Sequence, residues 1–297
     1  MISRRLLLGA ALGARAQFKA EVRVVNVLAS VRDKDGAFVA DLTKEDFELR
    51  EQGRPQVITY FSRQGELPLT LGLLVDTSMS QEHVLEAERS ASLRFLDQVL
   101  RVEKDKACVL QFDSRVLIKQ MLTNDYNKLE AALSLVDTPS RGELRRGIGG
   151  GTVLFDAIDT AARVLFQDAA GRRALILLTD GVDYGSNSTL AEAIDAAQKN
   201  DTLLYSILFA DRNGDSGRRV LEKLSRETGG AIYEVSKRLP IERIYERIQN
   251  ELRSQYNLGY VSDSPPSISE YRTIQLQTKR KGLTVQSRTR YWARPKD

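Results

Sequence analysis

The sequence predicts an α/β fold in which a doubly wound, mostly parallel sheet is inserted in a small β-sandwich formed by the N- and C-terminal flanks. From Leu69 onward, short apolar runs alternate with amphipathic segments of helical length, a pattern typical of βαβ units. The two ends hold only short alternating runs, and neither end has enough of them for an independently stable sheet. We therefore expect the ends to pair with each other around the α/β part.

The elements of the α/β part follow one another regularly. The expected strands are the apolar runs at residues 69–75, 106–112, 173–179, 202–209 and 231–235, with a short edge strand at 116–120. The expected helices are the amphipathic segments at 81–99, 125–136, 153–167, 188–199, 217–228 and 240–253. Ser188 or Thr189 and Ser216 are suitable N-caps, and Gly229-Gly230 is a helix stop. Strands that all run the same way place their carboxyl ends at one edge of the sheet.

The flanks supply the expected sandwich strands. These are the runs at 22–31, 47–53, 56–62, 256–261, 271–278 and 283–291. Lys279-Arg280-Lys281 lies between two alternating runs and is interpreted as a solvated hairpin turn. The expected division is 17–67 for the N-terminal sandwich strands, 68–253 for the α/β domain and 254–297 for the C-terminal strands.

Residues 1–16 have the composition of a signal peptide. Arg4 and Arg5 precede the apolar run from Leu6, and Ala14-Arg15-Ala16 supplies an A-x-A cleavage pattern. The paired arginines also resemble a twin-arginine signal, although the usual Phe is absent. No later run approaches the roughly 18 apolar residues of a membrane span, so we expect no stable transmembrane segment and a periplasmic or secreted protein.

Charge and rare residues exclude several function classes. The formal net charge is +4, but three arginines and no acidic residue lie in 1–16, so the remainder carries only +1 and nucleic acid is not implied. Cys108, the only cysteine, lies in an apolar run and is expected to be a core thiol. His83 is the only histidine, and no G-x-S-x-G pattern surrounds Ser78, so a serine hydrolase is the least favoured reading and we expect no enzyme.

Oxygen-bearing side chains follow the expected strands at the edge where ligands bind. Asp76, Ser78 and Ser80 come directly after the strand at 69–75, and Asp180 follows the strand at 173–179. Thr152 lies after three glycines and before an expected helix. Carboxylate and hydroxyl oxygens suit a hard cation, so we expect these five residues to bind Mg²⁺, or Mn²⁺ or Ca²⁺.

This ordered set resembles the metal-ion-dependent adhesion site (MIDAS) of the von Willebrand factor type A (VWA) family, which is written D-x-S-x-S, then T, then D. Over nearly the full length, the chain also resembles secreted bacterial VWA-related proteins of the acidobacterial type. Their flanking motifs match Val22 to Gly53 and Tyr256 to Tyr291 here. The resemblance implies a Rossmann-like domain and a non-enzymatic, adhesion-type module whose metal coordinates an acidic residue of a protein partner. The alternative is a structural envelope protein whose metal only stabilises the domain.

Four further features bear on function. The arginines at 141, 145 and 146 precede the glycine loop and are expected to rim the metal site and steer an acidic partner. Asp183, Tyr184 and Ser186 lie on the same rim and are expected to be either ligand contacts or parts of a solvated loop. The run from Asp211 to Asp215 lacks the glycine of an EF-hand calcium loop. The glycines at 147–151 lack the Gly-Lys-Ser/Thr of a phosphate loop and favour a close approach of the Thr152 backbone to the metal.

Overall fold

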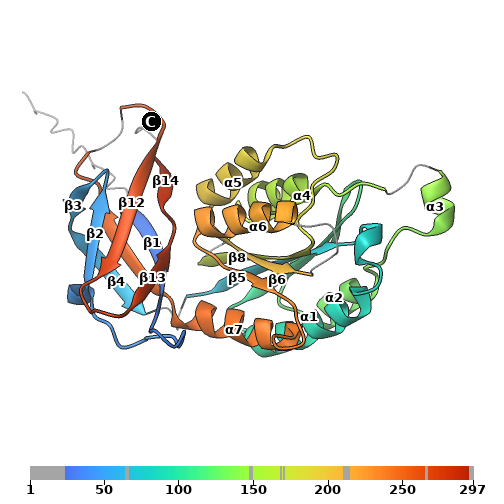
Figure 1. The fold of residues 1–297 in the computed structure, drawn as a ribbon, viewed down its shortest axis with the longest axis horizontal. Coiled ribbons are helices and arrows are strands. Elements are labelled where there is room, and N and C mark those ends of the chain that lie inside the picture. Colours follow the sequence, from blue (N-terminus) through green and yellow to red (C-terminus); the bar gives the residue numbers. More distant parts are fainter. Residues whose placement is uncertain are drawn as a thin grey trace, which may run out of the picture.

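The structure is a computed structural model that describes residues 24–63, 67–146, 150–167, 169, 171–209, 215–264 and 267–293. The expected signal peptide and the loop at 211–214 lie outside these ranges. The fold combines a helix-covered parallel sheet with two smaller antiparallel sheets (Figure 1). The predicted fold class is therefore confirmed.

The central sheet has six strands, in the order β10-β9-β8-β5-β6-β7. Their bounds are β5 (Leu69–Asp76), β6 (Lys106–Phe112), β7 (Val116–Thr123), β8 (Arg172–Thr179), β9 (Thr202–Leu208) and β10 (Ile232–Glu234). All neighbours pair in parallel except β6 and β7, which are antiparallel. All eight residues of β5 are buried, as expected for a central strand covered on both faces.

Helices cover both faces of this sheet. One face carries α1 (Leu85–Val99), α2 (Tyr126–Ser134) and α7 (Ile241–Ser254), and the other carries α4 (Leu154–Thr160), α5 (Leu190–Lys199) and α6 (Asp215–Thr228). Successive residues of β5 point to opposite faces of the sheet: Leu73 packs in the core with α1, α2 and α7, and Leu74 packs in the second core, with α4, α5 and α6. Burial in the second core raises the pKa of the Cys108 thiol to about 12, which confirms the predicted core thiol.

The two flanks build the sandwich together. Its strands are β1 (Val24–Arg32), β2 (Phe47–Glu51), β3 (Arg54–Gln56), β4 (Ile58–Arg63), β11 (Tyr256–Val261), β12 (Glu270–Thr278), β13 (Thr284–Ser287) and β14 (Arg290–Ala293). One sheet has the order β13-β1-β11-β4 and the other β14-β12-β2-β3. N-terminal strand β1 lies between two C-terminal strands, and C-terminal strand β12 pairs with N-terminal β2. Each sheet therefore contains strands from both ends of the chain.

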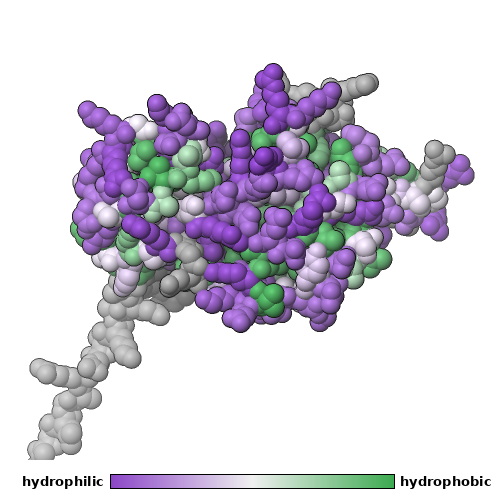
Figure 2. Space-filling model, turned by 90° about the horizontal axis from the view of Figure 1, so that it is seen from below, coloured by the Kyte–Doolittle hydropathy of each residue, from purple (hydrophilic) through white to green (hydrophobic). Residues whose placement is uncertain are grey.

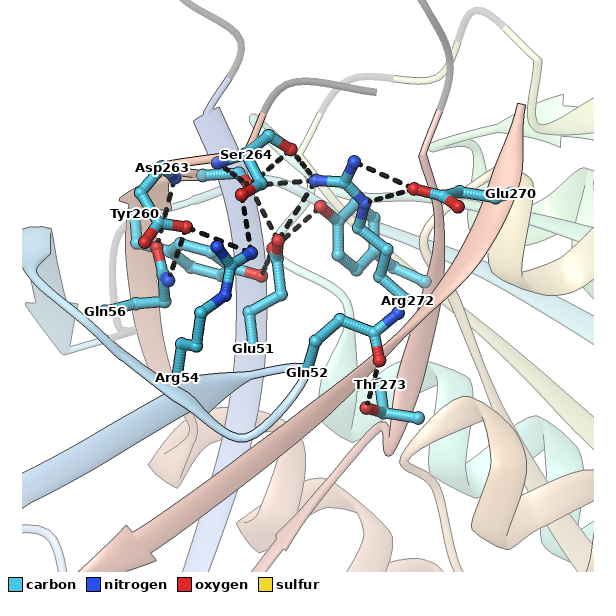
Figure 3. A network of polar contacts seen from close by, with 12 residues as sticks. Glu51, Gln52, Arg54, Gln56, Tyr260, Asp263, Ser264, Glu270, Arg272 and Thr273 are labelled. Atoms are coloured by element: carbon cyan, nitrogen blue, oxygen red, sulfur yellow. Dashed lines mark hydrogen bonds and ion pairs between the residues drawn. The ribbon is translucent and has the colours of Figure 1, made fainter. Parts of the chain in front are cut away.

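A buried polar cluster ties these strands to one another (Figure 3). Glu51, at the end of β2, accepts hydrogen bonds from the hydroxyls of Tyr260 (2.6 Å), Tyr291 (2.9 Å) and Ser262 (2.6 Å). The guanidinium of Arg272, on β12, lies 3.1 Å from the same carboxylate and 2.8 Å from Glu270. Glu51 is fully buried, and its two oxygens are occupied by protein groups.

Two local predictions need correction. Lys279-Arg280-Lys281 is not a hairpin turn, because β12 and β13 belong to different sheets and the run crosses between them, with Arg280 paired to Asp41 and Asp46. Ser216 is not an N-cap, since α6 begins at Asp215, whereas Thr189 does cap α5 and accepts from the Glu192 N–H.

Element lengths also differ in places. A short 3₁₀ turn at Met79–Gln81 precedes α1, which begins only at Leu85. α4 is followed directly by a π-helical segment at Ala161–Leu165. An additional short helix, α3 (Arg141–Arg145), begins with a capping box between Ser140 and Glu143.

The sandwich lies at the amino edge of the central sheet, opposite the edge that α3 flanks (Figure 1). A buried carboxylate joins the two parts: Glu251 of α7 accepts from Ser30 (3.1 Å) and Arg32 (2.6 Å) of β1. The face shown in Figure 2 is largely hydrophilic, with small separate apolar patches. Within the described ranges, no helix is long and apolar enough to cross a membrane.

Candidate metal centre

Three loops meet at the carboxyl edge of the central sheet. The first follows β5 and carries Asp76, Ser78 and Ser80, the second follows β8 and carries Asp180, and the third carries Thr152 into α4. The first two meet because β5 and β8 are adjacent parallel strands. The edge is the one expected to bind ligands in an open α/β sheet.

Asp76 is fully buried at the base of the site. One carboxylate oxygen accepts from the Ser78 N–H (2.9 Å), and the other accepts from the Thr179 hydroxyl (2.6 Å). Burial raises the pKa of Asp76 to about 6, because the hydrogen bonds from Ser78 and Thr179 only partly offset it and the charge of Asp180 adds to it. The carboxylate is thus fixed in position but poorly neutralised.

A chain of hydroxyls leads from this loop to the second carboxylate. The Ser78 and Ser80 hydroxyls lie 3.1 Å apart, and the Ser80 hydroxyl donates to Asp180 Oδ2 at 2.8 Å. The other oxygen of Asp180 accepts from the Val182 N–H at 3.0 Å. The structure therefore brings Asp76, Ser78, Ser80 and Asp180 together, although the residues come from two strands.

Thr152 reaches the same edge through its backbone. Its N–H donates to Tyr184 O (3.0 Å), and its carbonyl accepts from Tyr184 N–H (2.8 Å). The next residue, Val153, donates to Asp113 O at 2.8 Å, which ties the loop to the end of β6. A Cβ at Gly151 would lie 3.0 Å from Tyr184 O and 3.2 Å from the Cα of Ser114, so a larger residue would require one of these backbone segments to shift. Thr152 is thus fixed between two loops, and no described hydrogen bond joins its hydroxyl to the other four residues.

The residues present fit a divalent cation. Within the described part of the chain, neither Asp76 nor Asp180 forms an ion pair with a Lys or Arg. The described residues also hold no cluster of three or more His, Cys, Asp or Glu side chains, so the donor set is two carboxylates plus hydroxyls. Oxygen donors of this kind match a hard cation, and a bound cation would stabilise the charged form of Asp76, whose pKa is raised by burial and further by the charge of Asp180.

Two contributors were not predicted from the sequence. Thr179 orients Asp76, yet it lies in an apolar run and carried no signal of its own. Glu88, on α1, is fully buried, and neither of its oxygens has a hydrogen-bond partner among the described residues. Burial, and then the charge of Asp76, raise its pKa well above the usual value. A signal for Glu88 existed, because it lies three residues after Leu85 on the buried face of the helix.

The remaining rim residues have distinct roles. Asp183 accepts from the Phe155 N–H (3.1 Å) and the Ser186 hydroxyl (2.6 Å), so it caps the start of α4 rather than facing a ligand. Tyr184 is 72% exposed. Arg145 and Arg146 are exposed on and after α3. No described hydrogen bond joins Ser78 to His83, which is exposed in the turn before α1.

Solved structures share this fold at low sequence identity. BatB from Bacteroides thetaiotaomicron matches with a TM-score of 0.50 at 18% identity, over 62% of this chain and 97% of that one. A von Willebrand factor type A protein from Catenulispora acidiphila matches with a TM-score of 0.52 at 12% identity, over 94% of this chain and 76% of that one. Proximal thread matrix protein 1 from the mussel byssus, whose structure has a zinc-occupied MIDAS motif, matches with a TM-score of 0.53 at 16% identity, over 69% and 50% of the two chains.

A search of curated proteins found no match. The model of the von Willebrand factor type A domain, in contrast, matches residues 71–247, which span the central sheet from β5 to α7. With the loops at the carboxyl edge arranged as described, this match establishes that the chain belongs to the von Willebrand factor type A domain family.

Proposed function

We propose that the protein is an exported, non-enzymatic module that captures a protein partner through a divalent metal ion. Asp76, Ser78, Ser80, Thr152 and Asp180 would hold the ion, which is Mg²⁺ or alternatively Mn²⁺ or Ca²⁺. The observation that carries the proposal is the chain of hydrogen bonds from Ser78 through Ser80 to Asp180, beside the buried and unneutralised Asp76.

The donor set leaves a role for a partner. Two carboxylates and three hydroxyls supply few charged ligands, and a hard cation keeps exchangeable positions in such a site. Bound there, the ion would act as a Lewis acid that accepts a carboxylate oxygen. An Asp or Glu of the partner would complete the site. Arg145 and Arg146, with Arg141, would speed the approach of an acidic surface.

The test combines metal binding with partner capture. The full chain without residues 1–16 should bind Mg²⁺ in calorimetry and should capture an envelope protein in Mg²⁺ but not in EDTA. Thr152→Ala should weaken capture at least tenfold, whereas Thr284→Ala, at an exposed position on β13, should not. Replacing Arg145 and Arg146 by Gln should lower the association rate and its salt dependence.

Two results would contradict the proposal. Capture that is indifferent to EDTA and to Thr152→Ala would place the contact elsewhere. Metal binding that raises the melting temperature without any metal-dependent capture would favour a purely stabilising ion.

A further inference from the structure

Three exposed apolar side chains belong to the loops that carry the proposed metal ligands or pair with them. Met79 is 42% exposed, Val182 is 37% exposed and Tyr184 is 72% exposed. We call these three residues the apolar rim. Aromatic residues and Met are enriched at protein–protein interfaces, so side chains of this kind on the loops of a candidate binding site are suited to contact a partner.

Each member of the apolar rim is attached to a proposed metal ligand. Met79 lies between Ser78 and Ser80 in the chain. The Val182 N–H donates to the Asp180 carboxylate at 3.0 Å. Tyr184 exchanges two backbone hydrogen bonds with Thr152. The backbone positions of the apolar rim are therefore set by the same loops that position the proposed metal ligands.

The loop that carries two of these residues is held rigidly. Gly181 has φ +80°, and a Cβ at this position would lie 2.5 Å from Gly217 O, so the loop packs directly against α6. The paired hydrogen bonds to Thr152 fix Tyr184 at the other end. Tyr184 thus combines a fixed backbone with an exposed ring, which are the properties of a binding hot spot.

The surroundings add positive charge. Arg115 is exposed in the loop after β6, beside the Thr152 loop, and Arg145 and Arg146 are exposed at α3. The hydroxyl and N–H of Ser140 lower the pKa of Glu143, and the charges of Arg146 and Arg115 lower it further, which places both arginines in the neighbourhood of Glu143. Asp183, the acidic residue of the same loop, is occupied by its contacts to α4.

We propose that the apolar rim selects a partner segment in which an acidic residue stands next to a large apolar or aromatic side chain. The carboxylate would occupy the metal centre, and the neighbouring side chain would pack on Tyr184, Met79 and Val182. This inference rests on the proposed function and specifies its partner. It predicts that a carboxylate with an attached ring binds better than the same carboxylate without one.

Butyrate and 4-phenylbutyrate provide the test, since they share a carboxylate and differ by a ring. For the Mg²⁺-loaded chain, titrations followed by NMR should show about tenfold tighter binding of 4-phenylbutyrate. The advantage should fall to within about twofold in Tyr184→Ala and should persist in Tyr60→Ala, which removes an exposed tyrosine from β4. The alcohol 4-phenylbutanol should bind weakly, because it lacks the carboxylate.

The outcomes separate the two proposals. If both carboxylates bind equally and EDTA releases both, or if Tyr184→Ala keeps the tenfold advantage, the apolar rim has no selective role and the metal function stands. If neither carboxylate binds in a Mg²⁺-dependent way, both proposals fail. Calorimetry should show unchanged Mg²⁺ affinity in Tyr184→Ala, so that a lost metal site cannot account for the loss of selectivity.

Discussion

Two buried aspartates at opposite ends of the central sheet differ in how they are neutralised. Asp105, at the amino edge, accepts from the Leu69 N–H (2.8 Å) and pairs with Arg101 at 3.0 Å. These bonds outweigh burial and lower the pKa of Asp105. Asp76, at the carboxyl edge, has only neutral donors, and burial raises its pKa to about 6. Both carboxylates are almost inaccessible to solvent, yet only Asp105 has an arginine partner within the described residues, and the pKa shifts of the two groups are opposite.

Glu51 extends this comparison to the sandwich. Like Asp105 it has an arginine partner, but it is also surrounded by three hydroxyls. Both neutralised carboxylates lie where chain segments must be joined: Glu51 at strand pairing between the flanks, Asp105 at the start of β5. Asp76 accepts hydrogen bonds from the Ser78 N–H and the Thr179 hydroxyl and has no arginine partner within the described residues.

The largest expected effect is at the Glu51 cluster. Arg272→Met leaves a buried carboxylate without its cation, so the free energy of unfolding should fall by about 3–5 kcal/mol in urea denaturation. Glu51→Gln in the same chain should restore part of the loss. Glu48→Gln, in an exposed pair with Arg50, should change stability by less than about 0.5 kcal/mol. A loss below about 1 kcal/mol for Arg272→Met would show that hydroxyls alone suffice for a buried carboxylate here.

A smaller effect is expected at Asp105. Asp105→Asn removes the ion pair and weakens the bond to Leu69, and it should lower the free energy of unfolding by about 2 kcal/mol at pH 7. The folded pKa is depressed, so the stabilisation is present above the ordinary pKa of about 3.9 and is lost as the pH falls through the lower folded value. Melting temperatures measured across this acidic range should therefore fall less steeply in the variant than in the wild type. Parallel curves would contradict the assignment.

The smallest stability effect is expected at Asp76. Asp76→Asn removes a buried charge that pairs with no Lys or Arg in the described part of the chain, so in EDTA the free energy of unfolding should change by about 1 kcal/mol or less, in the stabilising direction. Calorimetry should show at least a tenfold loss of Mg²⁺ affinity in the same variant. A destabilisation as large as that of Asp105→Asn would remove the contrast between the two edges.

Periodicity and local spacing were sufficient to predict the central sheet and the five candidate ligands. β5 and β8 are continuous apolar runs, and oxygen-bearing side chains follow each run directly. The same stretch of sequence therefore predicts both the strand and the candidate ligands at its end. The pairing of the flanks was predicted because neither flank alone has enough strands for a stable sheet. The site residues themselves remain a prediction that binding measurements must test.

Other features could not be predicted because their cause is not local. Whether Lys279-Arg280-Lys281 forms a hairpin turn or crosses between sheets depends on the pairing of β12 with β2 and of β13 with β1, and these two N-terminal strands lie more than 200 residues away in the sequence. Thr179 orients Asp76 across two strands and looks like an ordinary strand residue in the sequence. The late start of α1 results from the 3₁₀ turn that places Ser80 against Asp180.

The insertion of the α/β unit also bears on the order of folding. β4 pairs with β11 in the register Arg63↔Tyr256, so the sandwich cannot close until the two ends of a segment of roughly 190 residues meet. Closing such a loop while it is unstructured costs about 5 kcal/mol of chain entropy. Once the α/β unit has folded, the start of β5 and the end of α7 lie at the same edge of the central sheet, and most of this entropic cost is removed. β1 and β4 find their partners among the C-terminal strands β11 and β13, so we expect these two strands to stay unpaired until synthesis is almost complete and the chain to depend on holdase chaperones until then.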